Sequence, residues 1–379
     1  MTGHTDTETG LRQGNHEPGE HPDEAPPAFS TGPWLWLREN LFSSWPNVIL
    51  TLLAAYVLYL IIPPALNFFI FDATLEGNSR ADCREVASGA CWAFIRVRFT
   101  QFIYGFYPEE LRWRPNLAFV LLIVAVLPVL ADRLPFRRQW LYFSAAYPVI
   151  AYFLLYGGFG LEPVDSQKFG GFLLTMVIGV VGIAVSLPIG IVLALGRRSM
   201  MPLVRILCVV FIEFIRGVPL ITLLFTAHLM LNYFLPPGTS FDLILRVLIM
   251  VTLFASAYIA EVVRGGLQAL PKGQYEAAEA MGLTYRQSMR LIVLPQALKI
   301  SIPGIVNTFI GLFKDTTLVI TIGLLDPLGM GKAALSQAKW IGLAAEVYIF
   351  VAIFFFICCF SMSRYSLYLE KKLHTGHER

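Results

Sequence analysis

Long apolar runs alternate with short polar segments along most of the chain. Several of the runs exceed the roughly 18 residues that a helix needs to cross the hydrocarbon core of a bilayer. The predicted membrane spans lie at about residues 47–71, 116–132, 140–157, 171–195, 209–235, 242–264, 302–325 and 341–363. The pattern therefore predicts an all-α integral membrane protein with about eight transmembrane helices.

The composition excludes a chain of soluble domains. Hydrophobic residues make up 56% of the 379 residues and charged residues 15%, whereas soluble domains average about 45–50% and about 25%. The mean hydropathy is +0.62. The net charge of +3 is small and spread along the chain. No basic stripe with interleaved aromatic residues is present, which argues against nucleic acid as a partner.

The N-terminal segment carries two expectations. Residues 1–32 are rich in Glu, Gly, Pro and Thr and contain no apolar run, so we expect a disordered cytoplasmic tail. They also lack the basic and apolar regions of a cleavable signal, so the first span is expected to remain as an anchor. Residues 33–44 interleave Trp34 and Trp36 with Arg38. This pattern indicates an interfacial helix or simply the lead-in to the first span.

The distribution of Lys and Arg predicts the orientation. The basic residues concentrate in the linkers 133–138, 197–198 and 264–299 and in the C-terminal tail. Under the positive-inside rule these segments are cytoplasmic, which places both termini inside. The loop at 72–115 is then periplasmic although it holds six arginines. Its acidic residues count little in this rule, so this loop is the weakest point of the predicted topology.

The cysteines and His228 suggest no metal site. Cys83 and Cys91 lie in the loop predicted to face outward, where an oxidising periplasm would join them in a disulfide; otherwise they are two free thiols packed beneath Trp92. No CxxC pair, HExxH motif or His/Cys/Asp cluster occurs, so no metal is expected. His228 stands alone in an apolar span and is interpreted as a hydrogen-bonding residue in helix packing.

Residues 273–295 carry the most informative pattern, GQYEAAEAMGLTYRQSMRLIVLP. The segment resembles the EAA motif of ABC-importer permeases: EAA, three residues, Gly, nine residues, then I-x-L-P, with every fixed position matched. An amphipathic cytoplasmic linker would account for helicity here but not for this spacing. The residues expected to couple the chain to an ATPase are Glu276, Ala277, Ala278, Gly282, Arg286, Ile292, Leu294 and Pro295.

The physical interpretation of this motif is a short helix, a sharp turn and a second helix. The first helix, at 274–281, offers small alanines that let another protein approach closely, and acids near its N-terminus suit the helix dipole. Gly282 permits a left-handed turn at the end of that helix. The second helix begins near Tyr285, and Leu294-Pro295 is expected to redirect the chain toward the seventh span. The resemblance implies a coupling helix that docks on a separate nucleotide-binding subunit.

Three further stretches extend the resemblance. EFIRGVPL at 213–220, AYIAEVVRGG at 257–266 and LFKDTTL at 312–318 look like the corresponding parts of polar amino-acid permeases of the histidine/glutamine/glutamate branch. In that branch the last stretch usually reads KDTSL, and Thr317 keeps the hydroxyl. The match covers about residues 165–365. It implies a five-helix type I ABC-importer core.

The N-terminal part has a narrower resemblance, carried by the loops CREVASGACWAFI and GLEPV and by the first three spans. These are similar to the M-type permease of general L-amino-acid (Aap/Bzt) transporters of Gram-negative bacteria. The implied organisation is an extension at 33–164, the core at 165–365 with a coupling loop at 265–300, and a cytoplasmic tail at 366–379.

Charged residues within the predicted spans suggest a transport path. Lys314 and Asp315 are expected near the middle of the seventh span, where each costs about 2.5–3.5 kcal/mol on insertion scales. We interpret them as functional, because a zwitterionic amino acid presents one carboxylate and one ammonium group. Asp315 could also hold a gating helix through Arg216. The candidate path or gate residues are Glu213, Arg216, Glu261, Arg264, Lys314, Asp315, Thr316 and Thr317.

Two of these sets are also spaced for simple salt bridges. Glu213 and Arg216, and likewise Glu261 and Arg264, stand three residues apart and can pair on one helix face. Two explanations account equally well for both pairs. One is an interfacial salt bridge with extended side chains, and the other is a role in contact with substrate.

The functional prediction is a permease subunit of an ATP-driven L-amino-acid importer in the bacterial inner membrane. The chain has no GxxxxGK[ST] motif, so ATP and Mg are expected on partner subunits, with no cofactor on this chain and no enzymatic activity of its own. The implied partners are a homologous permease, two ATP-binding subunits and a periplasmic amino-acid-binding protein. The alternative is a self-sufficient secondary carrier or channel. A secondary carrier has no reason to keep a helix that docks on a motor.

Overall fold

The computed structural model describes residues 33–86, 88–131, 134–230, 233, 236 and 241–373. The tail predicted at 1–32 lies outside the described residues. The chain divides into two compact units, Met1–Phe71 and Asp72–Arg379. The boundary predicted at 164/165 falls inside the second unit.

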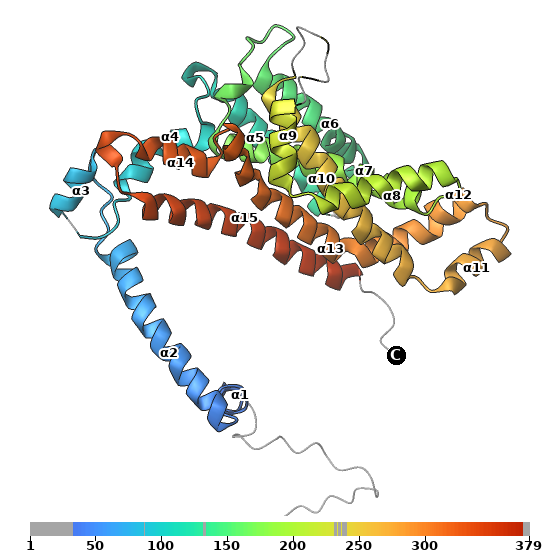
Figure 1. Ribbon diagram of the computed structural model, residues 1–379, viewed down its shortest axis with the longest axis horizontal. Helices are drawn as coiled ribbons and strands as arrows, with labels where there is room; N and C mark the ends of the chain where they lie inside the picture. Colours follow the sequence, from blue (N-terminus) through green and yellow to red (C-terminus); the bar gives the residue numbers. More distant parts are fainter. Residues whose placement is uncertain are drawn as a thin grey trace, which may run out of the picture. The chain divides into compact units, whose positions relative to one another are not determined.

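The first unit contains the predicted interfacial helix and the first span. Helix α1 (Pro33–Asn40) precedes α2 (Trp45–Leu66), which continues into one π-helical segment, η1 (Asn67–Phe71) (Figure 1). Ser44 occupies the N-cap of α2 with extended backbone, and a proline follows in the first turn. Proline is favoured there because that amide has no partner within the helix.

The regular secondary structure of the second unit is helical in its described residues, apart from isolated bridges. Its α-helices are α3 (Arg80–Val86), α4 (Ala93–Tyr104), α5 (Trp113–Leu130), α6 (Arg137–Tyr156), α7 (Gly171–Arg197), α8 (Pro202–Gly217), α9 (Leu220–Met230), α10 (Leu243–Ala269), α11 (Lys272–Ala280), α12 (Tyr285–Ser288), α13 (Leu294–Asp315), α14 (Pro327–Leu335) and α15 (Ala344–Leu373). The shorter 3₁₀ and π segments that bear on the site are η3 (Ser166–Lys168), η5 (Met289–Val293), η6 (Thr316–Ile322) and η7 (Ala338–Trp340).

Six helices in the described residues are long and apolar enough to cross a membrane, or up to seven when the bent pair α8 and α9 counts as one span. Each predicted span overlaps one helix or, for the span at 209–235, two helices. The third, predicted at 140–157, corresponds to α6, which does not pass the same length and hydropathy criteria.

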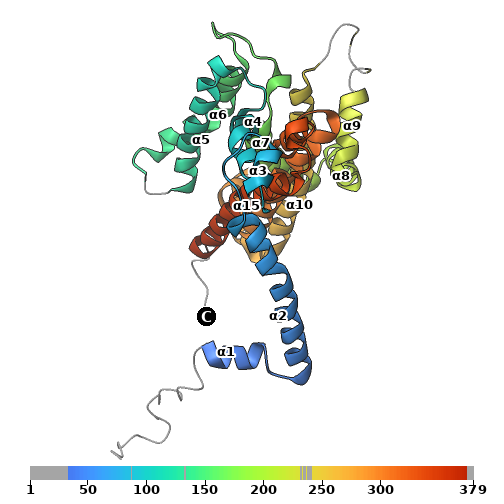
Figure 2. The same cartoon turned by 90° about the vertical axis from the view of Figure 1, so that its left-hand side faces the viewer.

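Helices α7 and α10 form the centre of the second unit. Small residues of α7 let neighbouring helices approach: a Cβ at Gly190 would lie 2.6 Å from the side chain of Ile259 in α10, and a Cβ at Gly182 would lie 3.1 Å from Leu312 in α13. Close approach through small residues is the usual way in which membrane helices pack. Helix α15 lies along α13, and α5 pairs with α6. Figure 2 shows the α5–α6 pair and the α8–α9 pair on opposite sides of this unit.

The helices define two ends of the second unit. We call the end that holds residues 271–295 the loop end, and the end that holds residues 72–108 and 323–343 the distal end. Helix α7 starts at the distal end, since the amide of Gly171 donates to the carbonyl of Leu325. Helix α10 ends directly before the loop end, and α15 begins directly after the distal end. All three helices therefore run from the distal end to the loop end.

A compact cap closes the distal end. Cys83 and Cys91 are joined by a disulfide, and the amide of Cys91 donates to the buried carboxylate of Glu346 at 3.1 Å. Arg80 donates to the carbonyl of Ile341 at 2.6 Å. These bonds fasten the segment between the first two predicted spans to the loop before α15.

The span predicted at 209–235 is wrong as a single helix. The structure has α8 from Pro202 and α9 to Met230, with a bend of 103° between them. Pro219 causes the break, because proline pushes the preceding residue out of the helical region. Val218 accordingly has φ −110° and ψ 134°.

Two other boundaries differ from the expectations. The α-helix of the seventh span ends at Asp315 and continues as η6, so Lys314 and Asp315 stand at a helix end rather than within a regular helix. Helix α15 extends to Leu373, so residues 366–373 of the predicted tail are helical.

Candidate functional site: the coupling loop and the charged cluster

The coupling loop is built as two helices joined by one turn. Helix α11 ends through two hydrogen bonds that together form a Schellman motif: the amide of Leu283 donates to Ala278 at 3.2 Å, and that of Gly282 donates to Glu279 at 2.8 Å. Gly282 has φ +70° and no atom within 4 Å of where a Cβ would stand. The requirement for glycine is therefore purely a backbone requirement.

The second helix starts with a capping box. Thr284 occupies the N-cap, with reciprocal bonding between Thr284 and Gln287. The helix runs on through the π segment η5 into α13. Residues Tyr285 to Ile322 thus form one continuous helical element.

The expectation that Leu294-Pro295 redirects the chain is wrong. Pro295 sits in the first turn of α13 and follows directly on η5. A proline lacks the amide donor and crowds the carbonyl one turn back. The wider π turn of η5 accommodates this proline, and the coupling loop continues into α13 as one helical element.

Tyr275 ties α11 to the transmembrane helices. Its hydroxyl donates to the carbonyl of Leu267 in α10 at 3.1 Å and accepts from Arg198 at 3.0 Å. The Arg198 guanidinium also lies 5.6 Å from the centre of the Tyr275 ring. Since Arg198 directly follows α7, one side chain connects the coupling helix to two central helices.

The two faces of α11 differ sharply. Ala278 is 1% exposed, and the neighbouring Tyr275 packs against the loop-end core that contains Met289 and Val293. The predicted contact of Ala278 with another protein is therefore wrong, and it anchors the helix instead. Glu276 and Ala277 are exposed. The exposed positions of the loop also include Glu279, Ala280, Met281, Gly282, Tyr285 and Arg286. Ile292 and Leu294 are half-buried, and Pro295 is exposed.

Next to the coupling loop, five charged residues form one cluster. Glu261 is its centre: it is bonded to Arg197 at 2.6 Å, to Arg264 at 2.8 Å and to Arg216 at 3.4 Å. Glu213 bonds to Arg197 at 2.9 Å. The Glu261 side chain is 15% exposed, which is low for a carboxylate. The cluster joins α7, α8 and α10.

The predicted pairing was correct for one of the two pairs. Glu261 and Arg264 bond as expected, but Glu213 bonds to Arg197 rather than to Arg216. Arg216 reaches across to Glu261 and also lies over the ring of Tyr258 at 5.7 Å.

Lys314 and Asp315 are separate from this cluster. The neighbouring Leu312 packs against Gly182, which is 15 residues before Arg197 on α7. At 1.5 Å per residue this places the two sites roughly 22 Å apart along the helix. The suggested bond between Asp315 and Arg216 is therefore wrong.

Lys314 is exposed, Asp315 is half-buried, and the hydroxyl of Thr317 donates to the Lys314 carbonyl at 3.0 Å. Thr316 is fully buried and donates to the carbonyl of Phe313.

Sequence reasoning missed four residues that the structure makes important. Arg197 and Arg198 were treated only as linker charges, although they bond to Glu261 and Tyr275. The spacing of Tyr275 and Ala278, three residues apart, was a signal for the inward face of α11. Arg246 is buried and donates to the carbonyl of His228 at 3.0 Å. The Nδ1 of His228 has no hydrogen-bond partner within the described residues, and its expected role in helix packing stays a prediction.

No group of three potential metal ligands occurs within the described residues. Residues 186–375 match the family model described as "Binding-protein-dependent transport system inner membrane component". The chain belongs to this family of ABC-transporter permeases.

Curated relatives of this permease match along nearly the whole chain. It is 52% identical over 358 residues to the inner membrane amino-acid ABC transporter permease protein YhdY of Escherichia coli, covering 94% of this chain and 97% of the relative. It is 49% identical to the glutamate/glutamine/aspartate/asparagine transport system permease protein BztC of Rhodobacter capsulatus, with 93% and 96% covered. A crystal structure of an amino acid ABC transporter with histidines has 27% identity and a TM-score of 0.47, over 52% of this permease and 90% of that chain.

Proposed function

We propose that this permease is one of two homologous membrane subunits of an ATP-driven L-amino-acid importer. Its partners are the second permease, two ATP-binding subunits that hold ATP and Mg, and a periplasmic amino-acid-binding protein. The similarity to YhdY and BztC, both named as permeases for amino acids, supports an amino-acid substrate. The proposed domains are an N-terminal extension at 33–164 and a five-helix core at 165–365.

The observation that carries this proposal is the two-sided construction of α11. One face is fixed through Tyr275, which bonds to Leu267 of α10 and to Arg198 directly after α7, and it carries the buried Ala278; the other face presents Glu276 and Ala277 to the surroundings. A load applied to the free face by an ATP-binding subunit is passed to both helices. A secondary carrier needs no such surface, so the importer is favoured.

The charged cluster is the proposed gate on the coupling side. Glu261 holds arginines from α7 and α8 as well as one from its own helix. Because three arginines share one carboxylate, single bonds can be exchanged when the helices shift. The cluster can therefore reorganise as the loop moves. Lys314 and Asp315 lie deeper along the path and are the proposed contacts for a zwitterionic substrate, together with Thr316 and Thr317.

The amphipathic helix α8 supports a second membrane subunit. Its exposed apolar positions recur at intervals of three and four residues, which gives a continuous stripe on one face. The stripe consists of Leu203, Ile206, Leu207, Val210 and Phe214. We assign this stripe to contact with the homologous permease.

The proposed orientation puts the loop end in the cytoplasm and the distal end in the periplasm, with both chain termini inside. The Cys83–Cys91 disulfide supports this orientation, because an oxidising compartment is needed to keep such a bond. A membrane-impermeant thiol reagent applied after reduction of intact spheroplasts should label Cys83 and Cys91. Labelling that requires lysis would reverse the orientation.

Docking of the ATP-binding subunits can be tested on the exposed face of α11. Ala277→Arg adds bulk and charge there and should prevent co-purification of the ATP-binding subunits while the two permeases stay together. Ala81→Arg makes the same change at an exposed alanine of the distal end and should leave co-purification unchanged. Full ATPase recovery with Ala277→Arg would show that this face does not dock a motor.

A further inference from the structure

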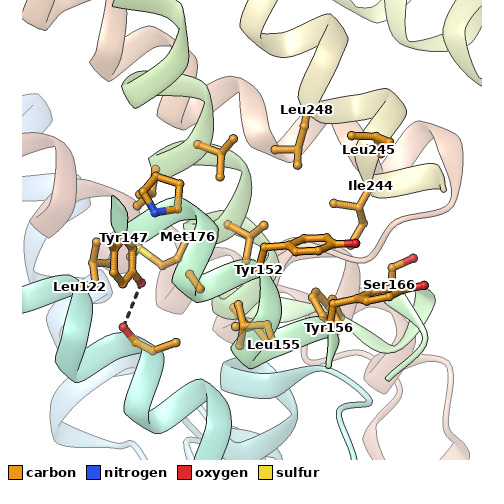
Figure 3. Close-up of a pocket in the computed structure, with 18 of the residues that line it drawn as sticks. Leu122, Tyr147, Tyr152, Leu155, Tyr156, Ser166, Met176, Ile244, Leu245 and Leu248 are labelled. Atoms are coloured by element: carbon orange, nitrogen blue, oxygen red, sulfur yellow. Dashed lines mark hydrogen bonds between the residues drawn. The ribbon is translucent and has the colours of Figure 1, made fainter. Parts of the chain in front are cut away.

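A cavity of about 310 Å³ lies between the α5–α6 pair and the core helices α7 and α10 (Figure 3). Leu122 and Ala151 line it from the extension side, and Met176, Val177 and Leu248 line it from the core side. Neither the coupling loop nor Lys314 and Asp315 contribute to it. It is therefore distinct from the proposed transport path.

The walls of the cavity are almost entirely carbon. Among its polar side chains, the hydroxyl of Tyr147 is already used, since it donates to the carbonyl of Ala118 at 2.9 Å. An amino-acid zwitterion placed here would lose its hydration without compensating partners, which is costly for charged groups. The lining instead suits a hydrocarbon ligand.

The position of the cavity places it in one leaflet of the membrane. Its α7 wall extends from Leu173 to Val181, and its α10 wall from Ile244 to Leu248. Both stretches belong to the first ten or eleven residues from the distal end of their helices, roughly 15 Å at 1.5 Å per residue. This is about half of a hydrocarbon core of roughly 30 Å. The cavity thus lies within the distal leaflet.

The mouth of the cavity has the features of a membrane interface. Tyr152 and Tyr156 stack with ring centres 5.4 Å apart and are 55% and 38% exposed. Tyrosines gather where headgroups meet hydrocarbon. Beside them, the exposed carboxylate of Asp242 is held by the hydroxyl of Ser166 and by the amide of Ile244. No Lys or Arg lines the cavity in the described residues.

We propose that this cavity binds one acyl chain of a distal-leaflet phospholipid whose zwitterionic headgroup carries a primary amine. The acyl chain fills the space between the two helix pairs, and the ammonium group meets the carboxylate of Asp242. A helix is about 10–12 Å across with its side chains, so a single flexible chain fits this volume better than a transmembrane segment. The lipid would complete the contact between the extension and the core.

Native mass spectrometry of the assembled complex from nanodiscs tests the acyl site. Val177→Phe fills the cavity from α7, whereas Val185→Phe makes the same change at an exposed position outside it. With phosphatidylethanolamine, the wild type and Val185→Phe should retain lipid after detergent transfer, and Val177→Phe should retain at least fivefold less. Equal retention by both variants, or none by the wild type, would overturn the site.

The headgroup and the identity of the occupant need two further readouts. Asp242→Asn keeps an N-cap side chain on α10 but should abolish the preference for phosphatidylethanolamine over phosphatidylglycerol. No preference in the wild type would overturn the headgroup assignment. A diazirine amino acid at Met176 should yield a lipid adduct on irradiation. An adduct with residues 45–71, or with the second permease, would show that protein rather than lipid occupies the cavity.

Discussion

The hydroxyl of Tyr275 in α11 donates a hydrogen bond of 3.1 Å to the main-chain carbonyl of Leu267 in α10. The same oxygen accepts from Arg198, so the coupling helix is fixed to two transmembrane helices through one atom. Hydrogen bonds that involve a charged group contribute about 1.5–3 kcal/mol. We therefore expect the coupling helix to move together with α7 and α10.

The first prediction concerns this bond. Tyr275→Phe keeps the ring over Arg198 but removes both hydrogen bonds, so α11 should move without drawing α7 and α10. Uptake by the reconstituted complex should fall three- to tenfold while basal ATPase activity persists. Tyr285→Phe is the control, because Tyr285 is 64% exposed. Equal uptake by the two variants would show that the bond has no role in coupling.

The second prediction concerns the turn. Because Gly282 has φ +70°, a side chain there costs about 1–2 kcal/mol through the backbone alone. Gly282→Val should misalign α11 and reduce both uptake and substrate-stimulated ATPase activity, with normal membrane insertion. Gly273 also has open space around its Cβ position but no positive φ, so Gly273→Ala should be tolerated. If Gly282→Val retains both activities, the turn does not position the docking face.

The third prediction separates the two glutamates of the charged cluster. Glu261→Gln leaves three arginines without their shared carboxylate and should lower uptake at least tenfold. Glu213→Gln removes a single bond from a side chain that is 54% exposed, where ion pairs contribute about 0–1 kcal/mol. We expect its uptake to stay within twofold of wild type. Similar losses in both variants, measured at equal complex yield, would contradict a gate centred on Glu261.

The fourth prediction concerns Asp326 at the N-cap of α14. One carboxylate oxygen accepts from the amide of Gly329 at 2.9 Å, and the other is buried without a partner within the described residues. Burial raises the pKa of Asp326 from 3.8 to about 6. Between pH 3.8 and about pH 6 the folded state therefore keeps a proton that the unfolded state has lost. The free energy of unfolding falls as the pH rises through about 6.

From the difference between the unfolded and folded pKa values, ionisation of Asp326 at neutral pH lowers the stability of the folded state by roughly 3 kcal/mol. Asp326→Asn should raise the thermal midpoint in detergent at pH 7.5 and remove the decline between pH 5 and pH 7. Asp82 provides an opposite control, because the hydroxyl of Ser79 lowers the pKa of this exposed carboxylate. A wild-type midpoint that is flat from pH 5 to pH 7 would contradict the assignment.

The sequence predicted the parts of the molecule that depend on local pattern. Apolar runs located the helices, and the spacing around Gly282 located the turn, because a left-handed turn restricts which residue can occupy it. The break at Pro219 was missed although Gly-Val-Pro was visible, since the surrounding residues are continuously apolar and outweighed a single proline.

The remaining features depend on contacts between distant segments. Arg197 and Glu261 are 64 residues apart in sequence, so no local pattern identifies their bond. Ala278 could not be assigned to the buried face before the packing of α11 was known. The cavity beside Tyr147 exists only because the α5–α6 pair packs against α7 and α10, and that packing leaves no trace in the spacing of apolar residues.

The claim that an external motor drives this permease through α11 has one direct test. The purified permease and its partners are reconstituted in proteoliposomes, and uptake of labelled L-amino acids is measured with and without the ATP-binding subunits. We expect uptake only when both permeases, the ATP-binding subunits, the binding protein and ATP are present, and its loss with Ala277→Arg. Uptake by this chain alone, driven by an ion gradient, would contradict the account.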